Sequence, residues 1–262
     1  MQCKRGIGMA QSMKAPTQQP KQAAKGMPYW VEPLFTIVAL GGFVVYAIWE
    51  TLWHNTGTYH NYVSPFFSPD VAGWFGFHVL TALYVVWVPF LFRFSCYYYR
   101  KEYFRGFFFH PAGCAVAEPG SRKLKAYKGE RRFPFNLNNL HRYAWYLAVI
   151  VLIFLWKDTV QGFIFKNGFG VGLGSILLLI NAVLLTAYTF SCHAFRNMIG
   201  GRKDCFSCVN GKPSTGYKWW KRVSGWNQFH GNWAWASLFS VWAVDLYIRL
   251  LSLGILHDPR IF

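Results

Sequence analysis

The chain has 262 residues, of which 53% are hydrophobic, 20% are aromatic and only 14% are charged. Soluble domains carry charged side chains at about a quarter of their positions, so this composition excludes a water-soluble globular protein and favours several membrane-spanning segments. The formal net charge of +17 does not indicate nucleic-acid binding, because the basic residues gather in particular loops and form no stripe with readout motifs. Membrane lipid is the expected partner, and no nucleic acid is expected.

The sequence divides into two predicted parts. Residues 1–28 are polar and carry no cleavable signal pattern, so we expect a disordered leader on the cytoplasmic side. Residues 29–262 are expected to form an all-α membrane domain, because lipid offers no partners to open backbone groups. A membrane-spanning helix needs about 20 residues. Five apolar segments satisfy this length, namely 34–53, 71–92, 143–165, 169–195 and 229–251.

The distribution of Lys and Arg predicts how the five helices cross the membrane. Basic residues are concentrated in the leader and in two loops, 93–142 and 191–228. The segment 54–70 has none, and only Lys166 lies between the third and fourth spans. Because cytoplasmic loops carry an excess of Lys and Arg, the N-terminus and both basic loops are predicted to be cytoplasmic and the C-terminus to lie outside.

Four charged residues lie near the predicted outer ends of two spans. Asp245 and Arg249 are four residues apart, so we expect them to pair on one helix face. Lys157 and Asp158 lie at a similar depth in the third span. An ion-pair network that joins the third and fifth spans is favoured over a functional role.

Thiol and imidazole side chains gather at the predicted cytoplasmic face. His141 begins the third span, Cys192 and His193 end the fourth, His230 begins the fifth, and Cys114 lies in the first basic loop. Because the cytosol is reducing, such a group indicates a metal or redox centre and not a set of disulfides. Taken singly, each residue has a simpler interpretation, either as an interfacial hydrogen-bonding group or as a small apolar filler.

Three further cysteines lie on the same face. Cys96, within Ser-Cys-Tyr, is assigned to packing. Cys205 and Cys208 form a C-x-x-C sequence, a spacing at which two thiolates reach one ion. The same pair in a polar loop is also compatible with a free or regulatory dithiol.

Two kinds of metal centre fit these residues. Haem b requires two imidazoles from facing helices, which pairs among His141, His193 and His230 can supply. A Rieske-type [2Fe–2S] centre requires two Cys on one iron and two His on the other, and the mixture of thiols and imidazoles suits it. The soluble Rieske pattern, C-x-H followed by C-x-x-H, is absent from the sequence.

Several passages together resemble the membrane-anchor subunit of the mycobacterial and actinobacterial-type succinate dehydrogenase, the type F complex II. The resemblance covers about residues 30–262. The passages that carry it are 96–105 (CYYYRKEYFR), 110–119 (HPAGCAVAEP), 132–135 (RFPF), 139–143 (NLHRY), 191–193 (SCH) and 246–249 (LYIR).

This resemblance implies a five-helix anchor in the bacterial cytoplasmic membrane, with a flavoprotein and an iron–sulfur subunit on its cytoplasmic side. It also implies a membrane-embedded Rieske-type cluster in place of haem. The ligand set favoured under the resemblance is Cys114 and Cys192 on one iron, with His141 and His230 on the other. His193 is the substitute imidazole. The substitute thiolates are Cys205 and Cys208.

The activity implied is that of the electron-transfer subunit of a succinate dehydrogenase or fumarate reductase, without a complete active site in this chain. Succinate would be oxidised at a flavin in a partner, and electrons would reach a quinone near the cytoplasmic ends of the helices. The alternative from another class is a non-redox membrane protein, either a transporter or a scaffold whose basic loops recruit a partner.

Overall fold

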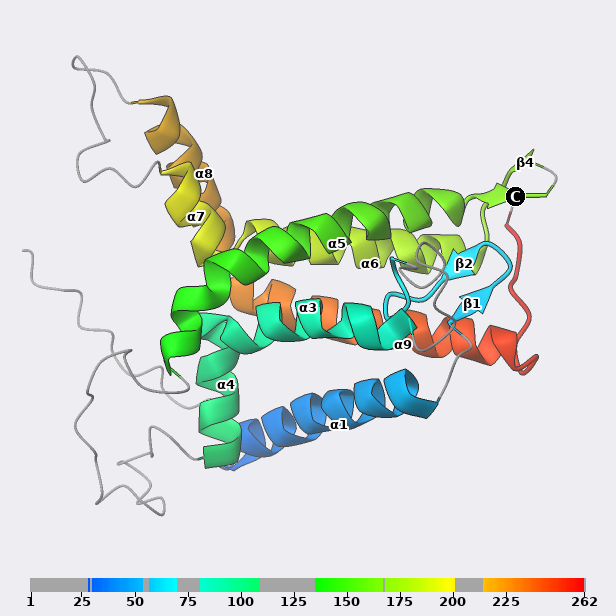
Figure 1. Cartoon of the computed structure of the whole chain (residues 1–262), viewed down its shortest axis with the longest axis horizontal. Coiled ribbons are helices and arrows are strands. Elements are labelled where there is room, and N and C mark those ends of the chain that lie inside the picture. The colour runs from blue at the N-terminus through cyan, green and yellow to red at the C-terminus, as the bar shows by residue number, and fades with distance from the viewer. Residues whose placement is uncertain are drawn as a thin grey trace, which may run out of the picture.

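The computed structural model describes residues 28, 30–53, 57–69, 81–108, 135–166, 168–200 and 214–261 of the chain. Within these ranges the protein is mostly helical, with two short β-hairpins (Figure 1). In chain order the elements are α1 (Val31–Trp53), β1 (Thr58–Tyr59), β2 (Tyr62–Val63), α3 (Thr81–Ser95), α4 (Tyr97–Phe108), the 3-10 helix η2 (Phe135–Leu140), α5 (His141–Gln161), β3 (Ile164–Phe165), β4 (Gly168–Phe169), α6 (Leu173–Phe190), α7 (His193–Ile199), α8 (Thr215–Asn227) and α9 (His230–Ser252).

The long helices lie side by side and their ends gather at two opposite ends of the bundle (Figure 1). At the end that we call the junction end, α3 meets α4 and α6 meets α7. At the other, the hairpin end, lie β1–β2, β3–β4 and the C-terminus.

Four helices, α1, α5, α6 and α9, are long and apolar enough to cross a membrane. They correspond to the first, third, fourth and fifth predicted spans. Helix α3 is also apolar, but its described part has 15 residues, and the first part of the second predicted span, 71–80, lies outside the described residues. That the second predicted span crosses the membrane therefore stays a prediction, and so does the orientation of the termini. The predicted leader lies outside the described residues except for Pro28.

Two predicted span boundaries are wrong, and local backbone geometry explains both. The third span was expected to reach residue 165, but α5 ends at Gln161, and the chain then turns into the hairpin in which Ile164 pairs with Phe169. The fourth was expected to reach residue 195, but α6 ends at Phe190. There Cys192 adopts an extended conformation (φ −67°, ψ 145°) and its thiol accepts a hydrogen bond from the Ala194 amide, so a new helix begins.

Aromatic packing holds the helices together at the junction end. The Trp145 ring on α5 is buried and stacks on Phe195 of α7, with ring centroids 5.5 Å apart. Its indole N–H donates to the Thr189 carbonyl on α6 at 2.9 Å, so the polar edge of the ring is satisfied as well. These contacts fix α5 against the C-terminal end of α6.

The C-terminal segment closes the hairpin end. The Asp258 carboxylate accepts hydrogen bonds from the Tyr62 hydroxyl at 2.6 Å, the Tyr247 hydroxyl at 2.7 Å and the Gly174 amide at 3.1 Å. A side chain at Gly172 would collide with the Asp258 carboxylate, so the glycine allows the tail to lie against the start of α6. One carboxylate thus ties the tail, the first hairpin and α6 together.

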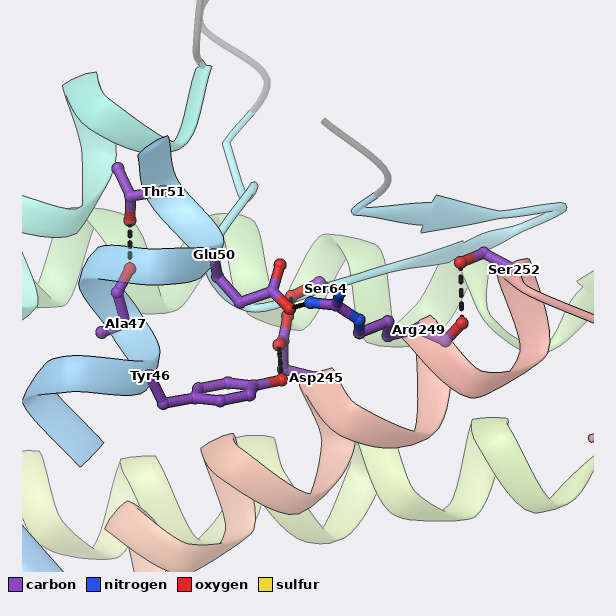
Figure 2. Close-up of polar contacts among 8 residues, drawn as sticks. All are labelled: Tyr46, Ala47, Glu50, Thr51, Ser64, Asp245, Arg249 and Ser252. Atoms are coloured by element: carbon purple, nitrogen blue, oxygen red, sulfur yellow. Dashed lines mark hydrogen bonds and ion pairs between the residues drawn. The ribbon is translucent and has the colours of Figure 1, made fainter. Parts of the chain in front are cut away.

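A polar cluster joins α1 to α9 near the hairpin end (Figure 2). Glu50 on α1 forms an ion pair with Arg249 on α9, and the exposed fractions of the two side chains are 4% and 12%. One turn earlier, the Asp245 carboxylate accepts hydrogen bonds from the Tyr46 hydroxyl at 2.5 Å and from the Ser64 hydroxyl. Each of the three charged groups is thus withdrawn from solvent and has a polar partner.

The pairing predicted for these charges is wrong. Arg249 pairs with Glu50 of α1, not with Asp245 of its own helix. Asp158 on α5 accepts a hydrogen bond from the Ser68 hydroxyl. The network therefore joins the fifth predicted span to the first. The spacing of Asp245 and Arg249 along α9 could not predict this pairing, because Glu50 lies on a different helix, α1.

The Arg249→Met substitution is expected to leave the Glu50 carboxylate buried without a cation, at a cost of roughly 3–5 kcal/mol. The double change Glu50→Gln with Arg249→Met removes the unpaired charge, so it should destabilise less than Arg249→Met alone. The melting temperatures of the purified variants, in one detergent, compare the two. A double variant that loses the sum of both single losses would contradict a direct pairing.

Candidate metal centre

The tripeptide Phe-Ser-Cys occurs three times in the sequence, and two of the copies end helices at the junction end. The third, 206–208, lies outside the described residues. The first copy, 94–96, ends α3, and the second, 190–192, ends α6. In both copies the cysteine stands between two helices, because α4 begins at Tyr97 and α7 at His193. The two thiols are thus presented at equivalent helix breaks.

Each of the two copies at helix ends faces a histidine at the first position of another helix. His141 begins α5, and its ring bridges the two copies. The Nδ1 atom lies 2.9 Å from the Ser95 hydroxyl, and the Nε2 atom lies 2.9 Å from the Cys192 sulfur.

His230 begins α9 and makes the reciprocal contacts. Its Nδ1 atom lies 2.8 Å from the Ser191 hydroxyl, and its Nε2 atom lies 3.4 Å from the Cys96 sulfur. Each histidine therefore contacts the hydroxyl of one tripeptide and the thiol of the other. We call these four contacts the crossed cluster, formed by Ser95, Cys96, His141, Ser191, Cys192 and His230.

The crossed cluster is buried among aromatic rings. The exposed fractions are 2% and 1% for Cys96 and Cys192, and 7% and 4% for His141 and His230. Phe92 stacks on His141 with centroids 4.9 Å apart, Tyr188 stacks on His230 at 5.0 Å, and Phe92 and Tyr188 contact each other edge to face at 5.3 Å. Thiols and imidazoles so enclosed have little access to water.

Comparison with known proteins identifies the chain. The family described as actinobacterial succinate dehydrogenase subunit SdhC matches residues 31–254. The chain belongs to this family. A solved structure, "Mycobacterium smegmatis Sdh1 complex in the apo form", contains a chain with 34% sequence identity and a TM-score of 0.77, and the match covers 93% of this chain and 95% of that one. No curated protein matches the sequence. The resemblance found in the sequence is confirmed, and the protein is an SdhC-type membrane anchor of succinate dehydrogenase.

Three of the residues predicted as ligands of this SdhC chain, His141, Cys192 and His230, belong to the crossed cluster. His193, the substitute imidazole, is exposed in this chain and has no contact with either thiol among its described contacts. Its ring centroid lies 6.4 Å from that of His230. The predicted ligand Cys114 and the substitute thiolates Cys205 and Cys208 lie outside the described residues.

Cys96 was assigned to packing, and that interpretation is incomplete. Its thiol contacts the His230 imidazole, as the Cys192 thiol contacts His141. The Phe-Ser-Cys copies at 94–96 and 190–192 both end an apolar segment, whereas the third copy at 206–208 lies in a polar loop. This shared position is the sequence signal that would have paired Cys96 with Cys192.

The donors form two Cys–His pairs and do not converge on one point. Within the described ranges, no group of three or more His, Cys, Asp or Glu side chains is placed to hold a single metal ion. This arrangement leaves each imidazole with its Nε2 atom toward a sulfur.

Burial and a nearby cation shape the electrostatic surroundings of the thiols. Burial raises the pKa of the Cys96 thiol, and it raises the pKa of the Cys192 thiol, to which the nearby Cys96 adds. Arg93 is the nearby cation, with its guanidinium 4.9 Å from the centre of the Tyr188 ring and donating to the Ala234 carbonyl at 3.2 Å. Burial thus disfavours the charged form of both thiols.

The Gly231→Ala substitution is expected to disturb the cluster through Tyr98. A Cβ atom at Gly231, next to His230, would lie 2.7 Å from the Tyr98 ring. That ring has little freedom to move, because the Trp235 indole N–H donates a hydrogen bond to the Tyr98 hydroxyl at 3.1 Å. We expect the melting temperature of the purified protein to fall, by an overpacking cost of about 1–3 kcal/mol.

Gly225→Ala on α8 is the matched control, since a Cβ atom at Gly225 would meet no other atom within 4 Å. This exposed helical site should be unchanged or more stable by about 0.5–1 kcal/mol. Equal effects of the two substitutions would contradict the close packing at Gly231.

Proposed function

We propose that this SdhC anchor holds a Rieske-type [2Fe–2S] cluster on Cys96, Cys192, His141 and His230, and that electrons pass through it to a quinone. The observation that carries the proposal is the crossed cluster, in which two thiols and two imidazoles at four helix ends form two Cys–His contacts of 3.4 Å or less in a buried site. A [2Fe–2S] centre of this type takes two thiolates and two imidazoles.

The proposal replaces one predicted ligand. Cys114 was favoured as the second thiolate, whereas the contact between Cys96 and His230 supports Cys96. Cys96 and Cys192 also share the same local sequence and the same place at a helix break. A Rieske-type centre has two thiolates on one iron and two imidazoles on the other, so Cys96 and Cys192 would hold one iron and His141 and His230 the other.

The same contacts argue against haem b. Haem would need two imidazole nitrogens to face each other across the porphyrin. Here the Nε2 atoms of His141 and His230 each face a thiol, and their ring faces are covered by Phe92 and Tyr188.

The surrounding residues support electron transfer at this position. When bound, the cluster supplies a one-electron carrier between the partner's iron–sulfur centres and the quinone. Arg93 keeps a positive charge beside the site and thereby favours the arrival of an electron. Phe92 and Tyr188 cover the two imidazoles. Tyr97, which follows Cys96 in the chain, is 54% exposed.

We further propose that the junction end faces the cytoplasm and carries the flavoprotein and iron–sulfur subunits. The proposal rests on membership of the SdhC family and on the similarity to a chain of the Mycobacterium smegmatis Sdh1 complex. It agrees with the basic residues Lys218, Lys221 and Arg222 of α8 at the same end. The setting would be the bacterial cytoplasmic membrane.

Replacement of either proposed thiolate, by Cys96→Ser or Cys192→Ser, is expected to remove two iron atoms from each purified complex. Quinone reduction should fall to background, whereas succinate oxidation with an artificial dye should continue, because the flavin lies in a partner. Iron analysis and both activity assays measure the outcome.

Cys114→Ser and His193→Ala are the matched comparisons and should retain iron and quinone reduction. A complex that keeps its iron in Cys96→Ser but loses it in Cys114→Ser would contradict the proposed ligand set.

The visible spectrum of the purified complex distinguishes the two cofactor hypotheses. An iron–sulfur centre gives broad absorption, and haem b gives sharp bands that change on reduction. We expect no haem bands after succinate is added. Sharp bands lost in the His141→Ala variant would favour the haem alternative.

A further inference from the structure

The serines of the Phe-Ser-Cys copies at 94–96 and 190–192 each contact the histidine nitrogen that does not face a thiol. Ser95 and Ser191 are both fully buried, with exposed fractions of 0%. Their hydroxyls lie 2.9 Å from His141 Nδ1 and 2.8 Å from His230 Nδ1. Buried hydroxyls at both imidazoles indicate a shared role.

The hydrogen-bond directions follow from the second contact of each serine. The Ser95 hydroxyl donates to the Leu91 carbonyl at 2.7 Å, and the Ser191 hydroxyl donates to the Tyr188 carbonyl at 3.1 Å. Because each hydroxyl has only one proton, its oxygen is left to accept from the imidazole. His141 and His230 therefore carry their protons on Nδ1.

This assignment leaves both Nε2 atoms as lone pairs that face the sulfurs of Cys192 and Cys96. A neutral imidazole binds a metal only through its unprotonated nitrogen, and the partner of the other nitrogen decides which one that is. The opposite tautomer would place a proton between ring and metal and would leave the Nδ1 lone pair facing a hydroxyl whose proton is already donated.

We propose that Ser95 and Ser191 are positioning residues that select Nε2 of His141 and His230 as the iron-binding nitrogens and tune the centre through Nδ1–H. The inference rests on the proposed function. A hydrogen bond from Nδ1–H to an oxygen makes the imidazole a stronger electron donor, and this stabilises the oxidised iron. Loss of either serine hydroxyl therefore raises the reduction potential.

A purely structural role is the competing interpretation, since hydroxyls often donate to the carbonyl four residues earlier in a helix. Thr159 on α5 does so, with a distance of 2.7 Å to the Leu155 carbonyl, and it is 2% exposed. None of its described contacts involves an imidazole. Thr159→Val thus provides a matched control for the loss of a buried hydroxyl.

The first experiment uses the unaltered complex, grown with histidine that carries ¹⁵N at Nδ1 only or at Nε2 only. Pulsed paramagnetic resonance of the reduced complex is expected to show strong coupling to ¹⁵Nε2 and weak coupling to ¹⁵Nδ1. Strong coupling to ¹⁵Nδ1 would overturn the inference but leave the cluster in place. Absence of any nitrogen-coupled iron–sulfur signal would overturn the proposed function instead.

The second experiment compares Ser95→Ala and Ser191→Ala with Thr159→Val. Each Ser→Ala complex is expected to bind iron up to about 10–100-fold more weakly, to show shifted g values and to have a higher midpoint potential. Ser→Thr at either position, which keeps the hydroxyl, should restore the original signal, and Thr159→Val should leave it unchanged. Unaltered g values and potential in both Ser→Ala complexes would overturn the inference. Where a Ser→Ala complex does not assemble, the ¹⁵N measurement decides.

Discussion

The crossed cluster depends on four helix ends that meet at one level of the bundle. His141 and His230 are the first residues of α5 and α9, and the two cysteines follow the last residues of α3 and α6. Cys192 has an extended backbone at the break between α6 and α7. Its thiol lies 2.9 Å from His141, whereas His193, the first residue of α7, is exposed.

The two ends of the bundle are held together by different forces. At the junction end, stacked and edge-to-face rings surround the site, with Phe92, Tyr188 and Trp145 buried at its centre. At the hairpin end, charged and hydroxyl groups carry the contacts, among them the ion pair between Glu50 and Arg249 (Figure 2). Rings suit a centre that must exclude water, since they cover imidazoles without competing for the metal. Buried ion pairs give orientation more than stability, because desolvation offsets much of their attraction.

Helix α1 is an element whose position depends on such directional contacts. Much of its apolar surface is exposed in this chain, including Val38 at 64% and Val45 at 68%. Its contacts with the bundle come from α4, from rings such as Phe43 against Trp242, and from the polar cluster at its end. In lipid an apolar face gains little from packing on another helix, so directional polar contacts have greater weight in placing it.

The sequence by itself determined the class of the protein, four of the long apolar helices and the SdhC family, because composition, hydrophobic length and local motifs are properties of short stretches of chain. It also indicated His141, Cys192 and His230 as metal-binding candidates, because all three are predicted to lie at the same face of the membrane. Only the tertiary structure brought Cys96 to His230 and Glu50 to Arg249. Cys96 and His230 are 134 residues apart in the chain, and Glu50 and Arg249 lie on the first and last helices. Which donor side chains contact each other depends on how α3, α5, α6 and α9 pack and on where each helix begins or ends. The local sequence around each donor does not determine the distances between donors on different helices.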